Sequence, residues 1–248
     1  MALSIEVVVE SWPIAGTFAI SRGSKREATV VVVRIGDGRI SGRGECVPYP
    51  RYGETPEATL AAIAGLTDVA AAGSLDRLAL QDLLPPSAAR NAVDCALWAL
   101  EAKRSGQPVH QLAGRSPPVP VTTCYTISLG DPAAMAAAAA AVPGFPLLKL
   151  KLGGAGDIER MAAVRAARPE ARLVADANEA WTDDLLEPLL AAAAAHGLET
   201  IEQPLPDGRD DRLASILHPL PVTADEAAHA ADSVDRLVGR YDAVNIKL

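Results

Sequence analysis

Three carboxylates and three lysines recur at a regular interval through the second half of the chain. They are, in chain order, Lys149, Lys151, Asp176, Glu202, Asp225 and Lys247. They lie at the ends of short apolar runs, and consecutive runs are roughly 22 to 26 residues apart, about one strand plus a crossover helix. Charged groups at the C-terminal ends of successive parallel strands lie where a (β/α) barrel has its active site. The spacing therefore predicts that these side chains meet.

The three carboxylates would supply oxygen ligands for a hard divalent cation, magnesium above all, with open positions for substrate oxygens. A single acid after a strand is more often a helix cap or a lysine partner, because helix N-termini attract negative charge. Asp176, Glu202 and Asp225 come in step, each after an apolar strand. The sequence therefore favours a metal site.

The lysines suggest acid–base chemistry. Lys149 and Lys151 alternate with leucines, so in a strand both face the barrel interior. Lys247 ends the sixth predicted strand and can face them across the barrel mouth. One lysine would remove an α-proton and the other would protonate the opposite face, a 1,1-proton transfer through a metal-stabilised enediolate. Solvated lysines at a strand end are the alternative interpretation.

The elements that precede this region predict a separate α+β domain. Residues 3–11 and 28–35 are rich in β-branched side chains, and the GDGR turn at 36–39 indicates a hairpin that leads into a strand ending near Glu45. Residues 17–28 are polar and are expected to form a loop. Helical periodicity follows through residues 54–104.

The proline-rich SPPVP segment at 116–120 is the predicted domain boundary, because its prolines break both helices and strands. We expect an N-terminal α+β domain over residues 1–116 and a partial barrel over residues 117–248. Strands and helices alternate strictly in the second part, so its sheet should be parallel. The expected strands are 121–127, 146–152, 172–176, 199–202, 221–223 and 243–247, and the expected helices begin at 131 and span 157–168, 182–196, 209–217 and 229–239. The fold class is therefore α/β, a TIM-type barrel incomplete at about six strands.

Composition excludes several classes of protein. The net charge of −8 leaves no basic surface for nucleic acid. No apolar stretch is long enough to cross a membrane, and acidic residues in the first apolar run argue against a signal peptide. Three scattered cysteines suggest buried thiols in a reducing compartment. The expected location is the cytoplasm.

The sequences KLK, DAN, EQP, ADE and NIKL, in this order and at these spacings, resemble the enolase superfamily, and most of all its muconate-lactonising-enzyme subgroup. The resemblance implies that Lys151 and Lys247 are the acid/base pair and that Lys149 is auxiliary. It also implies that Asp176, Glu202 and Asp225 bind one Mg²⁺ per subunit. Asn178 and Glu226 would support this site. The N-terminal part is similar to the capping domain of the family, which covers the barrel mouth.

Within the superfamily, IAGTFAISRGSKREATVVVV and CYTISL resemble the dipeptide epimerases, such as those acting on L-Ala-D/L-Glu. The substrate would then be a dipeptide or an N-acyl amino acid. Arg22 becomes a candidate partner of the distal carboxylate of the substrate through a bidentate ion pair, and Thr126 a second substrate contact. A plain surface arginine is the alternative interpretation of Arg22. The family resemblance also implies a homo-oligomer.

One departure from that family pattern concerns the C-terminal region. The dipeptide epimerases carry an Asp-x-Asp after strand eight, and this sequence ends after the sixth predicted strand. We therefore expect a chain truncated before strands seven and eight. Two alternatives remain open. One is a cycloisomerase or dehydratase of the same superfamily, of the muconate cycloisomerase or o-succinylbenzoate synthase type, and the other is a non-catalytic truncated relative.

Overall fold

The computed structural model describes residues 1–247, and the chain divides into two compact units. The first unit comprises Met1–Ile14 and Glu27–Pro120, and the second comprises Ala15–Arg26 and Val121–Leu248. The N-terminal hairpin therefore contributes its tip, Ala15–Arg26, to the second unit. The domain boundary expected between residues 116 and 117 stays a prediction.

Among the described residues, the first unit is built on a sheet with the strand order β1-β2-β3. Its strands are β1 (Ser4–Ile20), β2 (Gly23–Gly36) and β3 (Ser41–Cys46). β2 and β3 are antiparallel, and Val31 and Val33 of β2 are fully buried. The loop predicted for residues 17–28 is wrong, because β1 continues to Ile20 and β2 begins at Gly23. Pairing between the two strands supplies backbone hydrogen bonds even where the side chains are exposed.

The helices of the first unit begin where the sequence provides caps. The Thr55 hydroxyl accepts a hydrogen bond from the Ala58 amide at 3.1 Å, at the start of α1. The longest helix, α4, ends at Gly106, whose φ of 70° is a left-handed C-cap. The helical elements are η1 (Pro50–Tyr52), α1 (Pro56–Ala64), α2 (Thr67–Ala71), α3 (Arg77–Leu83), α4 (Ala88–Ser105) and α5 (Val109–Leu112).

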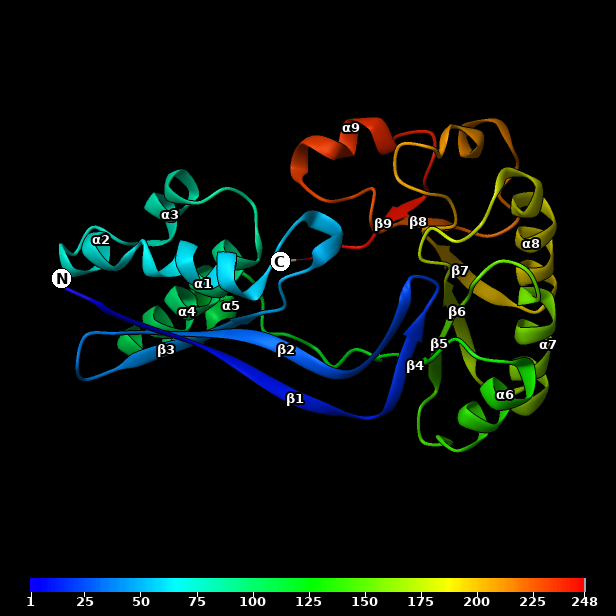
Figure 1. The fold of residues 1–248 in the computed structure, drawn as a ribbon, viewed down its shortest axis with the longest axis horizontal. Coiled ribbons are helices and arrows are strands. Elements are labelled where there is room, and N and C mark those ends of the chain that lie inside the picture. Colours follow the sequence, from blue (N-terminus) through cyan, green and yellow to red (C-terminus); the bar gives the residue numbers. More distant parts are fainter. Residues whose placement is uncertain (248) are drawn as a thin grey trace. The chain divides into compact units, whose positions relative to one another are not determined.

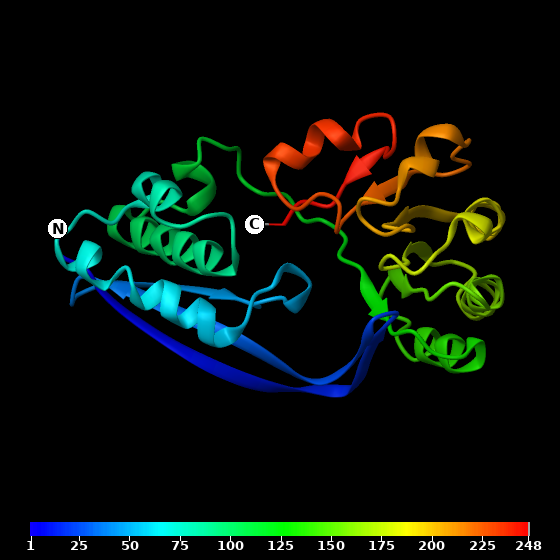
Figure 2. The same cartoon turned by 45° about the horizontal axis from the view of Figure 1, so that its top comes forward.

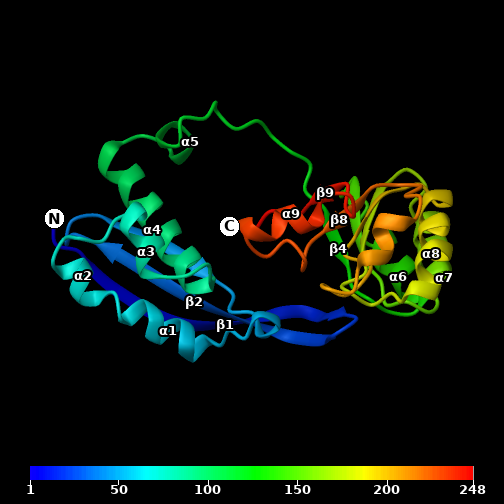
Figure 3. The ribbon, with the colours of Figure 1, turned by 90° about the horizontal axis from the view of Figure 1, so that it is seen from above.

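Helix α4 lies along the sheet of the first unit (Figure 3), and its close approach to β3 depends on two glycines. A Cβ atom added to Gly42 would lie 1.9 Å from the Ala96 carbonyl oxygen, and one added to Gly44 would lie 1.9 Å from the Ala92 carbonyl oxygen. Real Cβ atoms do not approach a backbone oxygen so closely. The SGRGEC sequence of β3 thus leaves the helix room to pack directly against the strand.

The second unit contains a parallel sheet with the strand order β4-β5-β6-β7-β8-β9 over the described part of the chain (Figures 1 and 2). Its strands are β4 (Tyr125–Ile127), β5 (Leu147–Lys151), β6 (Arg172–Asp176), β7 (Leu198–Glu202), β8 (Val222–Ala224) and β9 (Ala243–Val244). The predicted six parallel strands are confirmed. The helices α6 (Pro132–Ala140), α7 (Asp157–Ala167) and α8 (Asp183–Ala195) lie along one face of the sheet in Figure 1.

Alternation along β5 divides its side chains between two environments. Leu148 and Leu150 are fully buried in the core with Leu173 and Ile201 of the neighbouring strands. Lys149 and Lys151 alternate with these leucines and face the opposite side. A sheet that is covered on the helix side and charged on the other at its C-terminal end is the arrangement expected of a (β/α) barrel.

Several predicted elements are shorter than expected. The strand at 121–127 begins at Tyr125, and the strand at 243–247 is reduced to β9. The helices predicted at 209–217 and 229–239 become the short turns η2 (Asp211–Ser215), η3 (Ala231–Ser233) and α9 (Val234–Leu237). In the first of these segments, the Asp210 side chain accepts hydrogen bonds from Arg240 and Tyr241 instead of capping a helix.

We predict that Gly44→Ala destabilises the first unit by at least about 2 kcal/mol, because the added methyl group forces α4 away from β3. Denaturant-induced unfolding measures the change. Gly144→Ala is the control, since a Cβ there meets no atom within 4 Å. Equal stability of both variants would contradict the close packing of α4 on β3.

Candidate active site

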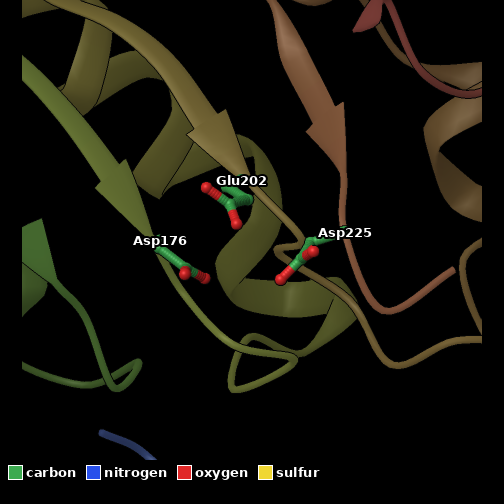
Figure 4. Close-up of side chains that lie close together, drawn as sticks. All are labelled: Asp176, Glu202 and Asp225. Carbon is green, nitrogen blue, oxygen red and sulfur yellow. The ribbon is translucent and has the colours of Figure 1, made fainter. Parts of the chain in front are cut away.

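The three carboxylates converge at the C-terminal ends of adjacent strands (Figure 4). Asp176 and Glu202 are the last residues of β6 and β7 and are direct neighbours in the parallel register. Asp225 follows β8 immediately. One carboxylate oxygen from each residue lies within 4.8 Å of the others. Parallel strand ends thus bring together acids that are far apart in the sequence.

Lys149 and Lys151 of β5 lie against these acids. The Lys149 Nζ atom is 2.6 Å from a Glu202 oxygen and 3.0 Å from Asp176 Oδ2. The Lys151 Nζ atom is 2.6 Å from the same Asp176 oxygen and 2.9 Å from Asn178 Oδ1. The same oxygen of Asp176 therefore forms ion pairs with two ammonium groups.

The segment after β9 brings further nitrogen groups to the cluster. Lys247 forms an ion pair with Asp225 and keeps 58% of its side chain exposed. The Asn245 amide donates hydrogen bonds to Glu202 at 3.0 Å and to Asp225 at 3.1 Å. Lys151 and Lys247 thus contact different carboxylates of the cluster.

Charge and burial act against each other in this cluster. Burial alone would raise the pKa of Asp176, but the ammonium groups of Lys151 and Lys149 outweigh it and hold that pKa below its usual value. Burial alone would lower the pKa of Lys149, but Asp176 and Glu202 raise it. The pKa of Lys247 is lowered, because partial burial and the positive charges of Lys149 and Lys151 together outweigh the acids Glu202 and Asp176. Such a shift favours the neutral amine that a general base needs.

Asn178 connects the cluster with the hairpin tip, residues 15–26. Its backbone carbonyl accepts hydrogen bonds from the Ser21 hydroxyl at 3.0 Å and from Arg22 Nη1 at 2.9 Å. Arg22 also pairs with Glu226 at 2.7 Å and with Glu179 at 3.0 Å. The structure thus places Arg22 and Asn178 together beside the cluster.

Thr126 of β4 lies next to Lys149 in the strand register and is half-buried. All ten side chains singled out from the sequence, Glu226 included, belong to the second unit. Nine of them are connected by the ion pairs and hydrogen bonds described above, and the strand register places Thr126 beside Lys149.

Two residues within the quoted sequence patterns received no role from sequence reasoning. Asn245 bridges two carboxylates, as described above. Gln203 is fully buried, and its Oε1 atom accepts hydrogen bonds from the backbone amides of Asp225 at 2.9 Å and Ala227 at 3.1 Å. The signal that could have identified both is their position, directly next to a carboxylate or close before a lysine of the set.

The loops after β6 and β7 contain backbone that non-glycine residues rarely adopt. Asn178, Glu179 and Gln203 have φ angles of 45°, 66° and 35°. The Glu179 amide donates to the Gln203 carbonyl at 2.9 Å, and the Gln203 amide donates to the Thr223 carbonyl at 2.8 Å. These bonds tie Glu179 to the segment directly after β7 and Gln203 to β8.

The donor set fits a divalent metal ion. Three carboxylates within 4.8 Å of one another repel unless positive charge is near. Here the lysine ammonium groups supply it, each within ion-pair distance of at least one acid. Oxygen donors of this type favour Mg²⁺ over softer metals. Asp176, Glu202 and Asp225 could therefore hold such an ion.

In the part of the chain that the structure describes, no helix is long and apolar enough to cross a membrane.

Comparisons with known proteins agree with this geometry. Residues 2–114 match the N-terminal domain of the mandelate racemase / muconate lactonizing enzyme family, and residues 133–248 match the enolase C-terminal domain-like family. The L-Ala-D/L-Glu epimerase of Escherichia coli K12 is 44% identical over 247 residues, which cover 99% of this chain and 77% of that protein.

The chain is also similar to solved structures of dipeptide epimerases and their homologues. An enolase family member from Agrobacterium tumefaciens with homology to dipeptide epimerases, with sodium and L-Ala-L-Glu bound, is 51% identical with a TM-score of 0.95. The match covers 98% of this chain and 74% of that one. A dipeptide epimerase from Cytophaga hutchinsonii, in complex with Mg and D-Ala-L-Val, is 25% identical with a TM-score of 0.89. That match covers 99% of this chain and 72% of the other.

We predict that Mg²⁺ binds the purified chain and raises its unfolding temperature, because a ligand that binds the folded state stabilises it. Glu202→Gln should weaken Mg²⁺ affinity at least about tenfold, as measured by titration calorimetry. Glu199→Gln on the same strand is the matched control, since Glu199 pairs with Arg172 at the surface. Equal affinities in the two variants would contradict the metal site.

Proposed function

Because the chain belongs to the mandelate racemase / muconate lactonizing enzyme family of the enolase superfamily, we propose that it is a Mg²⁺-dependent epimerase or racemase. The reaction is a 1,1-proton transfer at the α-carbon of a dipeptide such as L-Ala-D/L-Glu. The observation that carries the proposal is the carboxylate cluster contacted by Lys151 through Asp176 and by Lys247 through Asp225.

In this proposal, Lys151 and Lys247 are the two acid/base groups. They belong to different segments, β5 and the residues after β9, and they contact different carboxylates. One removes the α-proton as a neutral amine, and the other, as an ammonium group, returns a proton to the opposite face. Lys149 is the auxiliary group, and its ion pairs with Asp176 and Glu202 keep it charged.

Asp176, Glu202 and Asp225 would hold one Mg²⁺ per subunit. When bound, the ion would neutralise the charge that develops on the substrate carboxylate as the α-proton leaves. Asn245 and Gln203 keep the carboxylates in place, through the hydrogen bonds to Glu202, to Asp225 and to the backbone of residue 225.

The substrate is proposed to be a dipeptide or an N-acyl amino acid. Support comes from the relatives reported above, one of which was solved with L-Ala-L-Glu and one with D-Ala-L-Val. We propose that Arg22, whose side chain is 29% exposed, lies near the distal carboxylate, and that Thr126 contacts the substrate. These relatives are epimerases or homologues of epimerases, so we favour epimerisation over cycloisomerisation or dehydration. A homo-oligomeric state and a cytoplasmic location also stay predictions.

The test of this function is deuterium uptake at the α-carbon. We expect L-Ala-L-Glu to gain deuterium from D₂O and to invert at one α-carbon when Mg²⁺ is present. A chelator should abolish both changes, because the carboxylates alone cannot neutralise the developing charge. Mass spectrometry and chiral chromatography measure uptake and inversion. Loss of water instead of exchange would indicate a dehydratase, and no change with any member of a dipeptide panel would contradict the proposal.

Removal of either acid/base lysine should separate exchange from inversion. We expect Lys151→Ala and Lys247→Ala each to slow epimerisation at least about 100-fold. Each variant should retain exchange with the stereoisomer whose α-proton faces the remaining lysine. Chiral analysis combined with NMR detection of the α-proton measures both rates. Normal epimerisation by both variants would contradict the two-base mechanism.

A further inference from the structure

A continuous chain of polar contacts connects Lys151 with the hairpin tip. The Lys151 ammonium donates to Asn178 Oδ1 at 2.9 Å, and Asn178 Nδ2 donates to Glu226 Oε1 at 3.1 Å. The same Glu226 oxygen accepts from Arg22 Nη2 at 2.7 Å. All four residues lie in the second unit.

The chemistry of the two ends fixes the orientation of the Asn178 amide. An ammonium group can only donate hydrogen bonds, and an ionised carboxylate can only accept them. The amide oxygen must therefore face Lys151, and the amide nitrogen must face Glu226. A rotation of the amide by half a turn would place like groups together at both ends. Glu226 thus helps to hold Asn178 with its amide oxygen toward Lys151.

Glu226 is a buried acid, and only one of its two carboxylate oxygens has hydrogen-bond partners. The residue is 3% exposed, so it is no solvated surface charge. Among the described residues, its second carboxylate oxygen is buried without a hydrogen-bond partner. A buried polar atom in that state is unfavourable for folding. Stability alone therefore does not account for a carboxylate at this position.

Arg22 fixes Asn178 and Glu226 from the hairpin tip. Its Nη1 atom donates to the Asn178 carbonyl at 2.9 Å, and its Nη2 atom donates to Glu226. The tip is anchored independently, because the Leu129 amide donates to the Ala19 carbonyl at 3.0 Å. The Phe18 ring centroid is 5.9 Å from Lys151 Nζ. The tip therefore borders the lysine and also holds the groups that orient it.

We propose that Glu226, held by Arg22, is a positioning residue that acts through Asn178 on Lys151 and so on proton transfer at one face of the substrate. The proposal rests on the proposed function and deepens it. Lys247 lies outside this chain of contacts and pairs with Asp225 instead. Loss of Glu226 should therefore impair one of the two proton transfers and spare the other.

The experiment uses Glu226→Leu, which removes the acceptor, and Glu226→Gln, which keeps one acceptor oxygen. The variants Lys151→Ala and Lys247→Ala first identify the stereoisomer of the dipeptide that each lysine deprotonates. In Glu226→Leu, we expect deuterium exchange of the Lys151 stereoisomer, and epimerisation with it, to fall about 10- to 100-fold, the cost of a misplaced reacting group. Exchange of the Lys247 stereoisomer should stay within about twofold of the wild type. Glu226→Gln should restore most of the lost rate.

Two readouts and one control variant separate positioning from a general structural effect. The Mg²⁺ dissociation constant and the circular dichroism spectrum of Glu226→Leu should match those of the wild type. Glu187→Leu controls for the loss of a charge, because Glu187 is an exposed partner of Arg212. Equal slowing of both stereoisomers, or no slowing of either, would overturn the inference. Failure of the wild type to exchange any stereoisomer would instead contradict the proposed function.

Arg22→Leu tests the other end of the chain of contacts. A positioning role predicts slower exchange of the Lys151 stereoisomer with both L-Ala-L-Glu and the neutral L-Ala-L-Gln. A role limited to the substrate carboxylate predicts a higher KM for L-Ala-L-Glu alone. The second pattern would remove Arg22 from the proposed chain of contacts and overturn its part of the inference.

Discussion

The second unit depends on one electrostatic constraint, the mutual repulsion of three carboxylates held within 4.8 Å of one another. Adjacent parallel strand ends impose this proximity, because Asp176 and Glu202 are direct neighbours in the register. Lysine ammonium groups compensate the repulsion, and this compensation shapes the pKa values of Asp176, Lys149 and Lys247. The lysine charges therefore offset the repulsion that the close approach of the three acids creates.

Much of this arrangement could be predicted from the sequence, because a parallel sheet converts chain spacing into position. Each short apolar run forms a strand of the sheet, and the charged residue at or shortly after its end lies at the common edge. The alternation of leucine and lysine in β5 fixes the side that Lys149 and Lys151 face. The convergence of the three carboxylates and the lysines thus follows from a local pattern, an apolar run ending in a charged residue, that repeats along the sequence.

Other features could not be predicted, because they depend on contacts between distant segments. The polar residues 17–28 carry no apolar alternation, yet pairing of β1 with β2 extends the hairpin to its tip. The contact of Arg22 with Glu226 joins residues 204 positions apart. The hydrogen bonds that Asp210 accepts from Arg240 and Tyr241, in place of the expected helix cap after β7, likewise join separate segments.

The left-handed backbone of Asn178, Glu179 and Gln203 implies that the loops after β6 and β7 become ordered during folding, before any ligand binds. Such conformations cost about 1–3 kcal/mol each and persist where the surrounding structure determines them. Here the determining bonds come from the hairpin tip and the next strand. The loops after β6 and β7 therefore lose their conformational entropy when the chain folds. A ligand that binds beside these loops does not have to order them. Its binding free energy is therefore not spent on fixing their conformation.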